Sequence, residues 1–396
     1  MPNANRKIYP QITQIFTDLT EVIFKKFLIC VICVICGLVF FLLLPAAAFS
    51  EELIVELDRP SGDKPVEIVI SDINSDGRED IILAEIGSKG ITLFLAQANG
   101  SFKEEIVREI TPLSLASADI NQDNRNGLVV VDAFRGTLEI FLQDETGKLK
   151  YKDRFTPKEL AYGVQIGDVS NDGKNDIVVC SRGSNTISPL FLEEDGHIIF
   201  STTYKTGEGP TSLAICDLNS DGLNDVVTSN FSSSNISLFL QNEDGSLSPG
   251  QTYPSGKGSL YVACGNLSSD TKSDVVVANF KENSISLFIQ NEAGRLKGPT
   301  KYPTEEEPCW LAVGDANNDG KDDVVVANRD AGSLYLYAGR GEELVLEKIY
   351  AVPKKVYSVA IGDVNNDGLK DIVAASRLSF GERDKGPIAL RIFYGE

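Results

Sequence analysis

The residues whose types and spacing point to chemistry are aspartates and asparagines in short acidic loops. The first loop, DINSDGRED, runs from Asp72 to Asp80 and precedes the apolar run IILA. Its positions 1, 3, 5 and 9 carry oxygen donors, and glycine at position 6 permits a left-handed turn. Carboxylates this close repel unless a cation neutralises them. Hard oxygens at this spacing predict calcium, and magnesium less well, because an octahedral site that keeps its waters needs fewer protein oxygens.

Five loops carry the complete set of oxygen donors. Their predicted ligands are Asp72, Asn74, Asp76 and Asp80; Asp168, Ser170, Asp172 and Asp176; Asp217, Asn219, Asp221 and Asp225; Asp315, Asn317, Asp319 and Asp323; Asp363, Asn365, Asp367 and Asp371. The backbone carbonyl at position 7 is expected to point inward, from Arg78, Lys174, Leu223, Lys321 and Leu369. Position 12 of the first loop is Leu83, in an expected strand, so the loop is not an EF-hand. The sequence therefore predicts about five Ca²⁺ sites.

Two further loops are degenerate. Residues 119–127 end on Gly127 instead of an aspartate, and residues 266–274 begin with Asn266 and carry Thr271 at the glycine position. We expect weak or no metal binding there. The alternative for all of these loops is that they are Asx-turns, which cap strand ends without metal.

Composition argues against several classes of function. The formal net charge of −20 disfavours nucleic acid and anionic lipid. The one histidine, His197, lies in the turn-like stretch EEDGHIIF, which disfavours histidine catalysis and His-rich zinc sites. No pair of nucleophile and base stands out, so no catalytic residue is predicted.

The elements that position the acidic loops repeat along the chain. The loops begin at Asp72, Asp119, Asp168, Asp217, Asn266, Asp315 and Asp363, at intervals of 47 to 49 residues. A fixed period of this size indicates a solenoid or a propeller. Residues 211–256 read as four short strands, graded from apolar to polar, with the acidic loop between the first two. This pattern predicts a propeller blade whose apolar first strand lines the central channel and whose last strand faces solvent.

The ends of the repeat region predict how the ring closes. The seventh unit contains three strands, YSVAIGDV, DIVAAS and IALRIFYGE, and a spare strand at residues 53–62 precedes the first unit. We therefore predict an all-β protein, a seven-bladed β-propeller of four-stranded antiparallel blades. Its last blade is completed by the N-terminal strand, which hides exposed sheet edges.

The first fifty residues form a separate segment. Lys25 and Lys26 precede an uncharged apolar run at residues 27–44, followed by PAAAFSEE. The pattern predicts a hydrophobic helix that acts either as a signal peptide, cleaved near residue 50, or as an uncleaved membrane anchor. In both cases residues 51–396, the propeller, lie outside the cytoplasm, either secreted or periplasmic, or anchored to the membrane through residues 27–44.

The cysteines leave alternatives open. Cys30, Cys33 and Cys36 lie in the apolar run and are interpreted as small apolar residues. Cys180, Cys216, Cys264 and Cys309 are scattered through the repeats, where they could form two disulfides in any of three pairings or remain buried thiols.

The loop D-x-N-x-D-G-x-x-D between two apolar strands, as in DVNNDGLKDIVAA, resembles the FG-GAP, or VCBS, repeat family. Propeller repeats of this family occur in integrin α-subunit heads and in many exported bacterial proteins. The resemblance covers residues 51–396 and implies calcium in the first hairpin of the blades and a role in adhesion or ligand recognition. The literal Phe-Gly and Gly-Ala-Pro signatures are mostly absent, which favours the bacterial branch and weakens any inference about integrin ligands.

The face opposite the calcium loops is the expected place for a partner. The links between second and third strands, which we call the rim, contain Phe134, Arg135, Arg182, Phe231, Phe280, Arg329 and Arg377, and the longest link, residues 377–386, adds Phe380. Aromatic and arginine side chains are typical of binding hot spots. Alternatively, each phenylalanine packs between blades and each arginine pairs with a surface acid. Cys309 and Trp310, at the start of an inner strand, are interpreted as core.

These features favour a non-enzymatic, extracytoplasmic calcium-binding propeller that acts as a binding, adhesion or scaffold module. The expected partner is a protein or a glycan, and the propeller is expected to be monomeric, with no nucleic-acid binding and no membrane contact beyond the N-terminal segment. The alternative is a carbohydrate-active protein on the same fold, either a lectin or a polysaccharide lyase.

Overall fold

The computed structural model describes residues 30–35, 38–43, 52–57, 63–87, 89–108, 110–157, 159–192, 198–268, 270–352, 355–377 and 388–395. The chain divides into two compact units, Met1–Glu51 and Glu52–Glu396.

In the first unit the described residues form two short strands. Strand β1 (Cys30–Ile35) pairs antiparallel with β2 (Leu38–Leu43). The sequence predicts a helix here, so the structure differs from that prediction over these residues. The stretch is rich in β-branched valine and isoleucine, which favour strands. Among the described residues no helix is long and apolar enough to cross a membrane. The rest of residues 1–50 lies outside the described residues, and the signal or anchor role stays a prediction.

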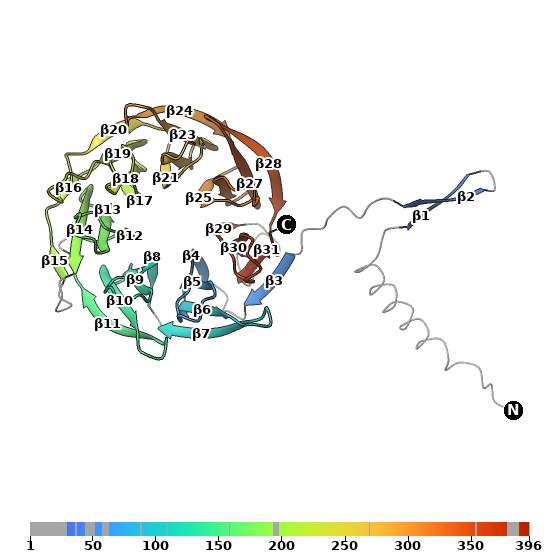
Figure 1. Cartoon of the computed structure of the whole chain (residues 1–396), viewed down its shortest axis with the longest axis horizontal. Coiled ribbons are helices and arrows are strands. Elements are labelled where there is room, and N and C mark those ends of the chain that lie inside the picture. The colour runs from blue at the N-terminus through green and yellow to red at the C-terminus, as the bar shows by residue number, and fades with distance from the viewer. Residues whose placement is uncertain are drawn as a thin grey trace. The chain divides into compact units, whose positions relative to one another are not determined.

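The second unit is a ring of seven antiparallel sheets (Figure 1). Blades one to three contain β4 (Lys64–Ser71), β5 (Asp80–Ile86), β6 (Gly90–Ala96) and β7 (Phe102–Arg108); β8 (Pro112–Ala118), β9 (Gly127–Asp132), β10 (Thr137–Gln143) and β11 (Leu149–Phe155); β12 (Gly163–Gly167), β13 (Asp176–Ser181), β14 (Thr186–Leu192), β15 (Ile198–Phe200) and β16 (Tyr204–Lys205). In the third blade, β15 and β16 both pair with β14 and together form a split outer strand.

The remaining blades follow the same order. Blades four to six contain β17 (Pro210–Cys216), β18 (Asp225–Asn230), β19 (Asn235–Phe239) and β20 (Gln251–Pro254); β21 (Ser259–Gly265), β22 (Asp274–Asn279), β23 (Ser284–Gln290) and β24 (Leu296–Pro303); β25 (Pro308–Gly314), β26 (Asp323–Asn328), β27 (Ser333–Arg340) and β28 (Glu343–Ala351). Blade seven contains β29 (Val356–Gly362), β30 (Asp371–Arg377), β31 (Ile388–Phe393) and β3 (Glu52–Leu57).

The ring closes as the sequence predicts. Strand β3 pairs antiparallel with β31, from Glu52 opposite Phe393 to Leu57 opposite Ile388. The outer edge of the last blade is therefore supplied by the strand that precedes the first blade. The seven-bladed, four-stranded, all-β architecture is confirmed.

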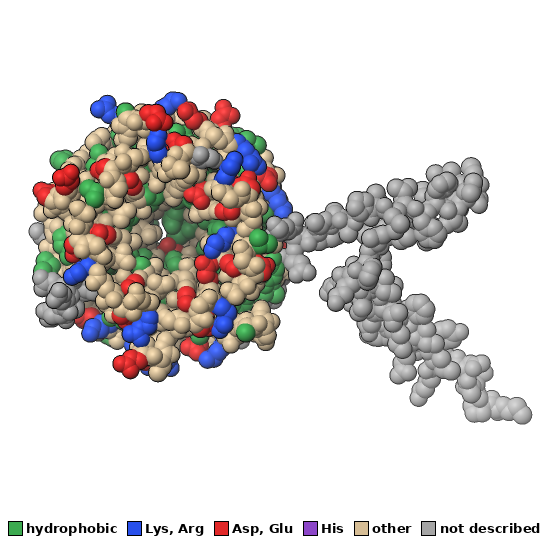
Figure 2. Space-filling view, in the orientation of Figure 1, with side chains coloured by type: hydrophobic (Ala, Val, Ile, Leu, Met, Phe, Trp, Pro, Cys, Tyr) green, Lys and Arg blue, Asp and Glu red, His purple; other side chains and the backbone are tan. Residues whose placement is uncertain are grey.

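Burial does not follow the predicted gradient completely. The first strand of each blade borders the channel, as expected, but the second strand is the most buried: every residue of β26 is buried, whereas β25 is only partly so. The second strand has a hydrogen-bonded neighbour on both edges and a packed blade on each face, while one edge of the first strand borders the channel. The last strands, such as β28, are mostly exposed. Figure 2 shows the central opening, with hydrophobic side chains on its wall.

The core lies between the blades. One cluster joins Val325 and Leu336 of the sixth blade to Val359 and Ile372 of the seventh. A disulfide between Cys216 on β17 and Cys264 on β21 links the fourth and fifth blades, while Cys180 and Cys309 are buried free thiols. The four cysteines of the repeats therefore form one bridge and two thiols.

Candidate functional site

The acidic loops all connect the first strand of a blade to the second, so they share one face of the ring. In the complete loops the aspartate at position 9 is the first residue of the second strand, as Asp80 is in β5 and Asp323 is in β26. The links between second and third strands lie at the opposite strand ends. The acidic loops and the rim therefore lie on opposite faces of the ring, as the sequence predicts.

Two left-handed residues curl each complete loop. In the first loop Ser75 and Gly77 have φ of 57° and 82°, and the equivalent glycines of the five loops have φ between 78° and 89°. A Cβ added at Gly77 would meet no atom within 4 Å. The glycine is therefore required by the backbone conformation and not by lack of space.

The carboxylates at positions 1 and 5 accept hydrogen bonds from the loop backbone. The Asp72 Oδ1 and Oδ2 atoms accept the N–H groups of Asp76 and Gly77 at 3.1 and 2.9 Å, and Asp76 Oδ1 accepts that of Arg78 at 3.0 Å. The loop beginning at Asp315 has the same bonds at positions 1 and 5. These are Asx-type turns, so this part of the metal-free alternative is present in the structure.

The aspartate at position 9 has a different role from the others. Asp225 is fully buried, and its two oxygens accept the N–H groups of Leu218 and Gln241, each at 2.8 Å. These two hydrogen bonds connect the start of the loop, at Leu218, to Gln241, which follows the third strand. Each oxygen has two lone pairs, so one remains on each for a cation. The sequence predicts a ligand at this position and does not reveal its hydrogen bonds to the backbone.

The three carboxylates of each complete loop repel one another. Burial raises the pKa of Asp80 to about 7; two backbone N–H donors oppose the rise, and the carboxylates of Asp76 and Asp72 add to it. The same causes raise the pKa of Asp225 to about 7 and those of Asp176, Asp323 and Asp371 to about 6. Hard oxygens that repel one another fit a divalent cation. Within the described ranges, however, no three acidic, His or Cys side chains are gathered closely enough to hold a metal ion as they stand.

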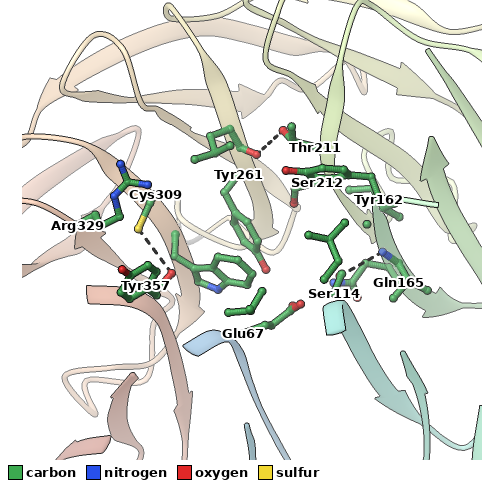
Figure 3. A pocket seen from close by; sticks show the side chains of 17 residues that line it. Glu67, Ser114, Tyr162, Gln165, Thr211, Ser212, Tyr261, Cys309, Arg329 and Tyr357 are labelled. Carbon is green, nitrogen blue, oxygen red and sulfur yellow. Dashed lines mark hydrogen bonds between the residues drawn. The ribbon is translucent and has the colours of Figure 1, made fainter. Parts of the chain in front are cut away.

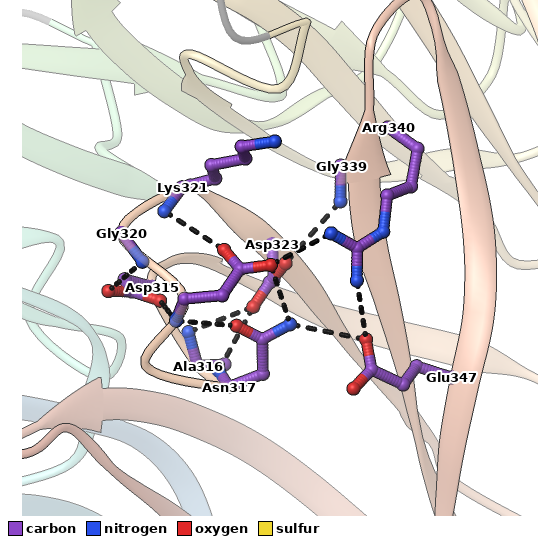
Figure 4. A network of polar contacts seen from close by, with 10 residues as sticks. Asp315, Ala316, Asn317, Gly320, Lys321, Asp323, Gly339, Arg340 and Glu347 are labelled. Atoms are coloured by element: carbon purple, nitrogen blue, oxygen red, sulfur yellow. Dashed lines mark hydrogen bonds and ion pairs between the residues drawn. The ribbon is translucent and has the colours of Figure 1, made fainter.

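In two of the complete loops an arginine side chain forms an ion pair with the carboxylate at position 5. In the sixth blade Arg340 Nη1 lies 2.9 Å from Asp319 Oδ2 (Figure 4). In the same loop the side-chain amide of Asn317 donates a hydrogen bond of 3.1 Å to the carboxylate of Glu347. Arg78 pairs with Asp76 in the same way. These exposed ion pairs are weak, so a bound cation would compete with them at little cost.

The degenerate loops keep the turn but lose part of the donor set. Asn124 replaces glycine with φ of 61°, and Asp119 still accepts the N–H groups of Asp123 and Asn124. A Cβ at Gly127 would lie 2.9 Å from Phe141 O, which leaves no room for an aspartate. In the other degenerate loop Thr271 has φ of 75°, an unusual conformation for a β-branched residue.

A matched pair of variants separates the two roles within one loop. At pH 8, above the pKa of Asp225 of about 7, Asp225→Asn should destabilise the calcium-free protein by roughly 1–3 kcal/mol, because an amide NH₂ then faces a buried N–H donor. Asp221→Asn, at exposed position 5, should change the calcium-free stability by less than about 0.5 kcal/mol yet reduce the stabilisation by calcium. Urea unfolding in EDTA and in calcium measures both. Equal losses in EDTA would contradict the distinction.

Four predicted rim residues form a continuous row across blades three to six. The Arg182 guanidinium lies 5.5 Å from the centroid of the Phe231 ring, which is 6.3 Å from that of Phe280. Arg329 lies 4.9 Å from the Phe280 centroid on the other side. Lys281, which the sequence analysis did not single out, lies 4.4 Å from the Phe231 centroid. We call Arg182, Phe231, Phe280 and Arg329 the rim row.

The other rim residues are arranged differently. Phe134 is 85% exposed, and Arg135 pairs with the buried Asp132 at 2.6 Å. Arg329 also pairs with Glu307, as the alternative interpretation expects. Arg377 is only 1% exposed, so the structure places it in the interior and not on the rim surface. Phe380 lies outside the described residues, as does His197.

A cavity in the central channel was missed by the sequence analysis. Its volume is ≈ 190 Å³, and residues from the first strands of all seven blades line it (Figure 3). Trp310, interpreted as core from the sequence, is partly exposed and lines this cavity together with the buried Cys309. An alignment of the repeats would have pointed to this cavity. The equivalent position in the first strands of the seven blades is occupied by Glu67, Ser114, Gly163, Ser212, Tyr261, Trp310 and Ser358.

Seven four-stranded blades, each with an acidic loop in its first hairpin, define a repeat-built β-propeller. The chain belongs to the FG-GAP-like repeat family, which matches residues 72–130, 119–179, 168–228, 266–326 and 315–374, more than half of its length. No curated protein matches the sequence.

Solved structures share the fold at low sequence identity. BBS1N in complex with ARL6DN has a TM-score of 0.61 and 13% identity, over 86% of this chain and 96% of that one. Kuenenia stuttgartiensis hydrazine synthase has a TM-score of 0.57 and 15% identity, over 85% and 96%. A protein from Lactobacillus plantarum has a TM-score of 0.55 and 14% identity, over 78% and 96%. At these identities the likeness shows the fold alone.

Proposed function

We propose that this chain is an extracytoplasmic, calcium-stabilised propeller that binds a protein partner through the rim row and has no enzymatic activity. The observation that carries the proposal is the row itself, in which Arg182, Phe231, Phe280 and Arg329 lie in contact across four blades. Arginine and aromatic side chains dominate binding hot spots. The row lies on the face opposite the acidic loops, which leaves it accessible when those loops hold metal.

A protein partner is favoured over a glycan by the fold comparison. BBS1N, a propeller of similar fold, is in complex with a protein, ARL6DN. The rings of the rim row also stack on cations of this chain, because Lys281 and Arg182 both lie over Phe231. A glycan would need these ring faces, whereas a protein side chain can pack against the edges of the rings and the guanidinium groups.

Calcium and an extracytoplasmic location are supported by separate features. In each of the five complete loops three carboxylates repel one another, and a divalent cation would relieve this repulsion. The Cys216–Cys264 disulfide suits an oxidising compartment, and so does the export pattern of residues 1–50. Loops of this kind outside the cell often bind calcium at ~0.1–1 mM, a concentration found there and not in cytosol.

A non-enzymatic role is favoured by the chemistry of the described side chains. Burial raises the pKa values of the Cys180 and Cys309 thiols to about 12, so neither is a thiolate nucleophile at neutral pH. The convergent aspartates of the loops are engaged by backbone N–H groups. Hydrazine synthase has a similar fold, but at 15% identity that likeness gives no reason to assign a catalytic residue here.

Site-directed crosslinking tests the proposed partner surface. A photoreactive residue at Phe231 should capture a discrete protein from the exported fraction of the source organism, in calcium. The same residue at Ile349, an exposed position on outer strand β28, is the control. Adding Arg182→Ala and Arg329→Ala to the Phe231 probe should weaken capture at least roughly tenfold, because hot-spot truncations cost about 2 kcal/mol or more.

Two results would count against the proposed partner. The same proteins captured from both positions would show non-specific contact. Binding on a glycan array, abolished by Phe280→Ala, would favour the lectin instead. Sedimentation of the purified propeller tests the accompanying proposal that it is monomeric.

A further inference from the structure

The channel cavity is built from one unusual position of the repeat. At the position four residues before the end of the innermost strand, four blades carry a serine or a glycine. The other three blades carry Glu67, Tyr261 and Trp310, and all three of these large side chains line the same cavity. Register places this position near the rim end of the strands, because Glu67 pairs with Ala84 while Ser71 pairs with Asp80 at the loop end.

The fold itself needs only a serine at this position. Ser358 Oγ accepts the N–H of Ile68 in the next blade at 3.0 Å, and Ser114 and Ser212 accept the N–H groups of Val164 and Val262 at 3.4 and 3.5 Å. Glu67 Oε2 makes the same bond, to the N–H of Leu115 at 2.9 Å. Glu67 therefore carries a second oxygen and an ionisable proton that the link between blades does not require.

Glu67 is buried without a cation. It is 3% exposed, and burial raises its pKa to about 8, although the Leu115 N–H and the Ser114 hydroxyl oppose the rise. In the described part of the chain no lysine or arginine forms an ion pair with it. Arg329, which also lines the cavity, already pairs with Glu307 and Asp330. With a pKa of about 8, Glu67 holds its proton at neutral pH, and a cation bound beside it would favour the ionised carboxylate.

Aromatic rings provide the rest of the wall. The Tyr261 and Trp310 rings stack with centroids 4.1 Å apart, and Tyr162 and Tyr357 also line the cavity. Figure 3 shows Glu67 and Tyr261 directed into the same space. Aromatic rings beside a carboxylate attract organic cations through their quadrupoles. The net charge of −20 also raises the concentration of cations near the protein.

We propose that the channel cavity binds a small organic cation, a protonated or quaternary amine on a compact apolar body. Glu67 is its counter-ion, and Tyr261 and Trp310 contact its apolar part. The volume of ≈ 190 Å³ is below the range of about 300–1,000 Å³ that is typical of sites for drug-sized ligands, so the cavity suits a compact ligand. This site does not depend on the rim row or on calcium in the loops.

The protein contains its own reporter for this site. Trp310 is the only tryptophan of the chain and lines the cavity, so its fluorescence should respond when a ligand enters. Benzylamine and choline, titrated into the protein in calcium, should each give a saturable change. Benzyl alcohol, matched to benzylamine in shape but uncharged, should bind at least about tenfold more weakly, and glucose should give no saturable change.

Two substitutions of Glu67 test the counter-ion. Glu67→Gln keeps an oxygen for the Leu115 N–H, and Glu67→Ser copies the residue of three other blades. Each should weaken binding of benzylamine at least about tenfold. Ser212→Ala removes the equivalent inter-blade acceptor on β17 without removing a charge, and should change the affinity less than about twofold. Calorimetric titration with thermal unfolding of each variant checks that the fold is retained.

The comparison of amine with alcohol uses the unmodified protein, so it does not depend on how the variants fold. Equal binding of benzylamine and benzyl alcohol would overturn the proposal. So would saturable binding of glucose alone, unchanged amine affinity in both Glu67 variants, or no saturable response to either amine.

Discussion

Calcium at about 1 mM should raise the thermal unfolding midpoint of residues 51–396 by roughly 3–10 °C, relative to the protein in EDTA. The increase follows from mass action, because a ligand that binds only the folded state stabilises it at every site. At about 1 mM calcium a site with a Kd of ~0.1–1 mM contributes about 0.4–1.4 kcal/mol, and five complete loops act together. The convergent carboxylates, whose repulsion helps to raise the pKa of Asp80 to about 7, would be neutralised in the same step.

The calcium experiment has an internal and an external control. Magnesium at equal concentration should give a much smaller increase, because it keeps several waters and needs fewer protein oxygens. Asp221→Asn should remove about one fifth of the calcium increment, since it alters one of the five complete loops. A midpoint that is the same in EDTA and in calcium would rule out the metal sites. The loops would then be Asx-turns whose hydrogen bonds suffice by themselves.

The repeat period explains how much of the fold could be predicted. Acidic loops at intervals of 47 to 49 residues set the number of blades, and alternating apolar runs set the strands. The spare strand before the first loop indicated the closure, because an unpaired sheet edge is unfavourable. In contrast, the burial of the second strand depends on neighbours from two other blades: in β26, Val325 packs with the seventh blade and Val326 with the fifth. No periodicity within one unit contains that information.

The candidate sites were predicted unevenly for the same reason. The metal loops are local in sequence, so their ligands could be named from the spacing alone. The rim residues were also found, yet which of them touch depends on the ring: Phe231 meets Phe280 across a blade boundary, whereas Arg377 points inward. The cavity was not predicted because its lining residues come mainly from the first strands of seven blades, one to three from each strand. The one indication of the cavity in the sequence is that Glu67, Tyr261 and Trp310 are large, whereas the equivalent residues of the other blades are serine or glycine.

Removing strand β3 should destabilise the propeller more than any single loop substitution. Leu53 and Val55 pack against Ile388, Leu390 and neighbouring residues of the core between the seventh and first blades. Burial of such side chains contributes about 1.5–3 kcal/mol each at full burial. Because both are only partly buried, residues 58–396 should lose roughly 3–5 kcal/mol once the paired backbone of six residues is included. Urea unfolding of residues 51–396 and 58–396, both in calcium, measures the difference.

The same truncation exposes the edge of β31, which offers its unpaired backbone groups to any free strand. A synthetic peptide with residues 51–62 should bind this edge and restore the unfolding midpoint in a concentration-dependent way. A peptide with Val55→Pro should not, because proline removes a backbone donor from the middle of the strand. Full stability of residues 58–396 without peptide would contradict a closing role for β3. Restoration by both peptides would show that the ladder from Glu52 to Leu57 is not what holds the last blade to the ring.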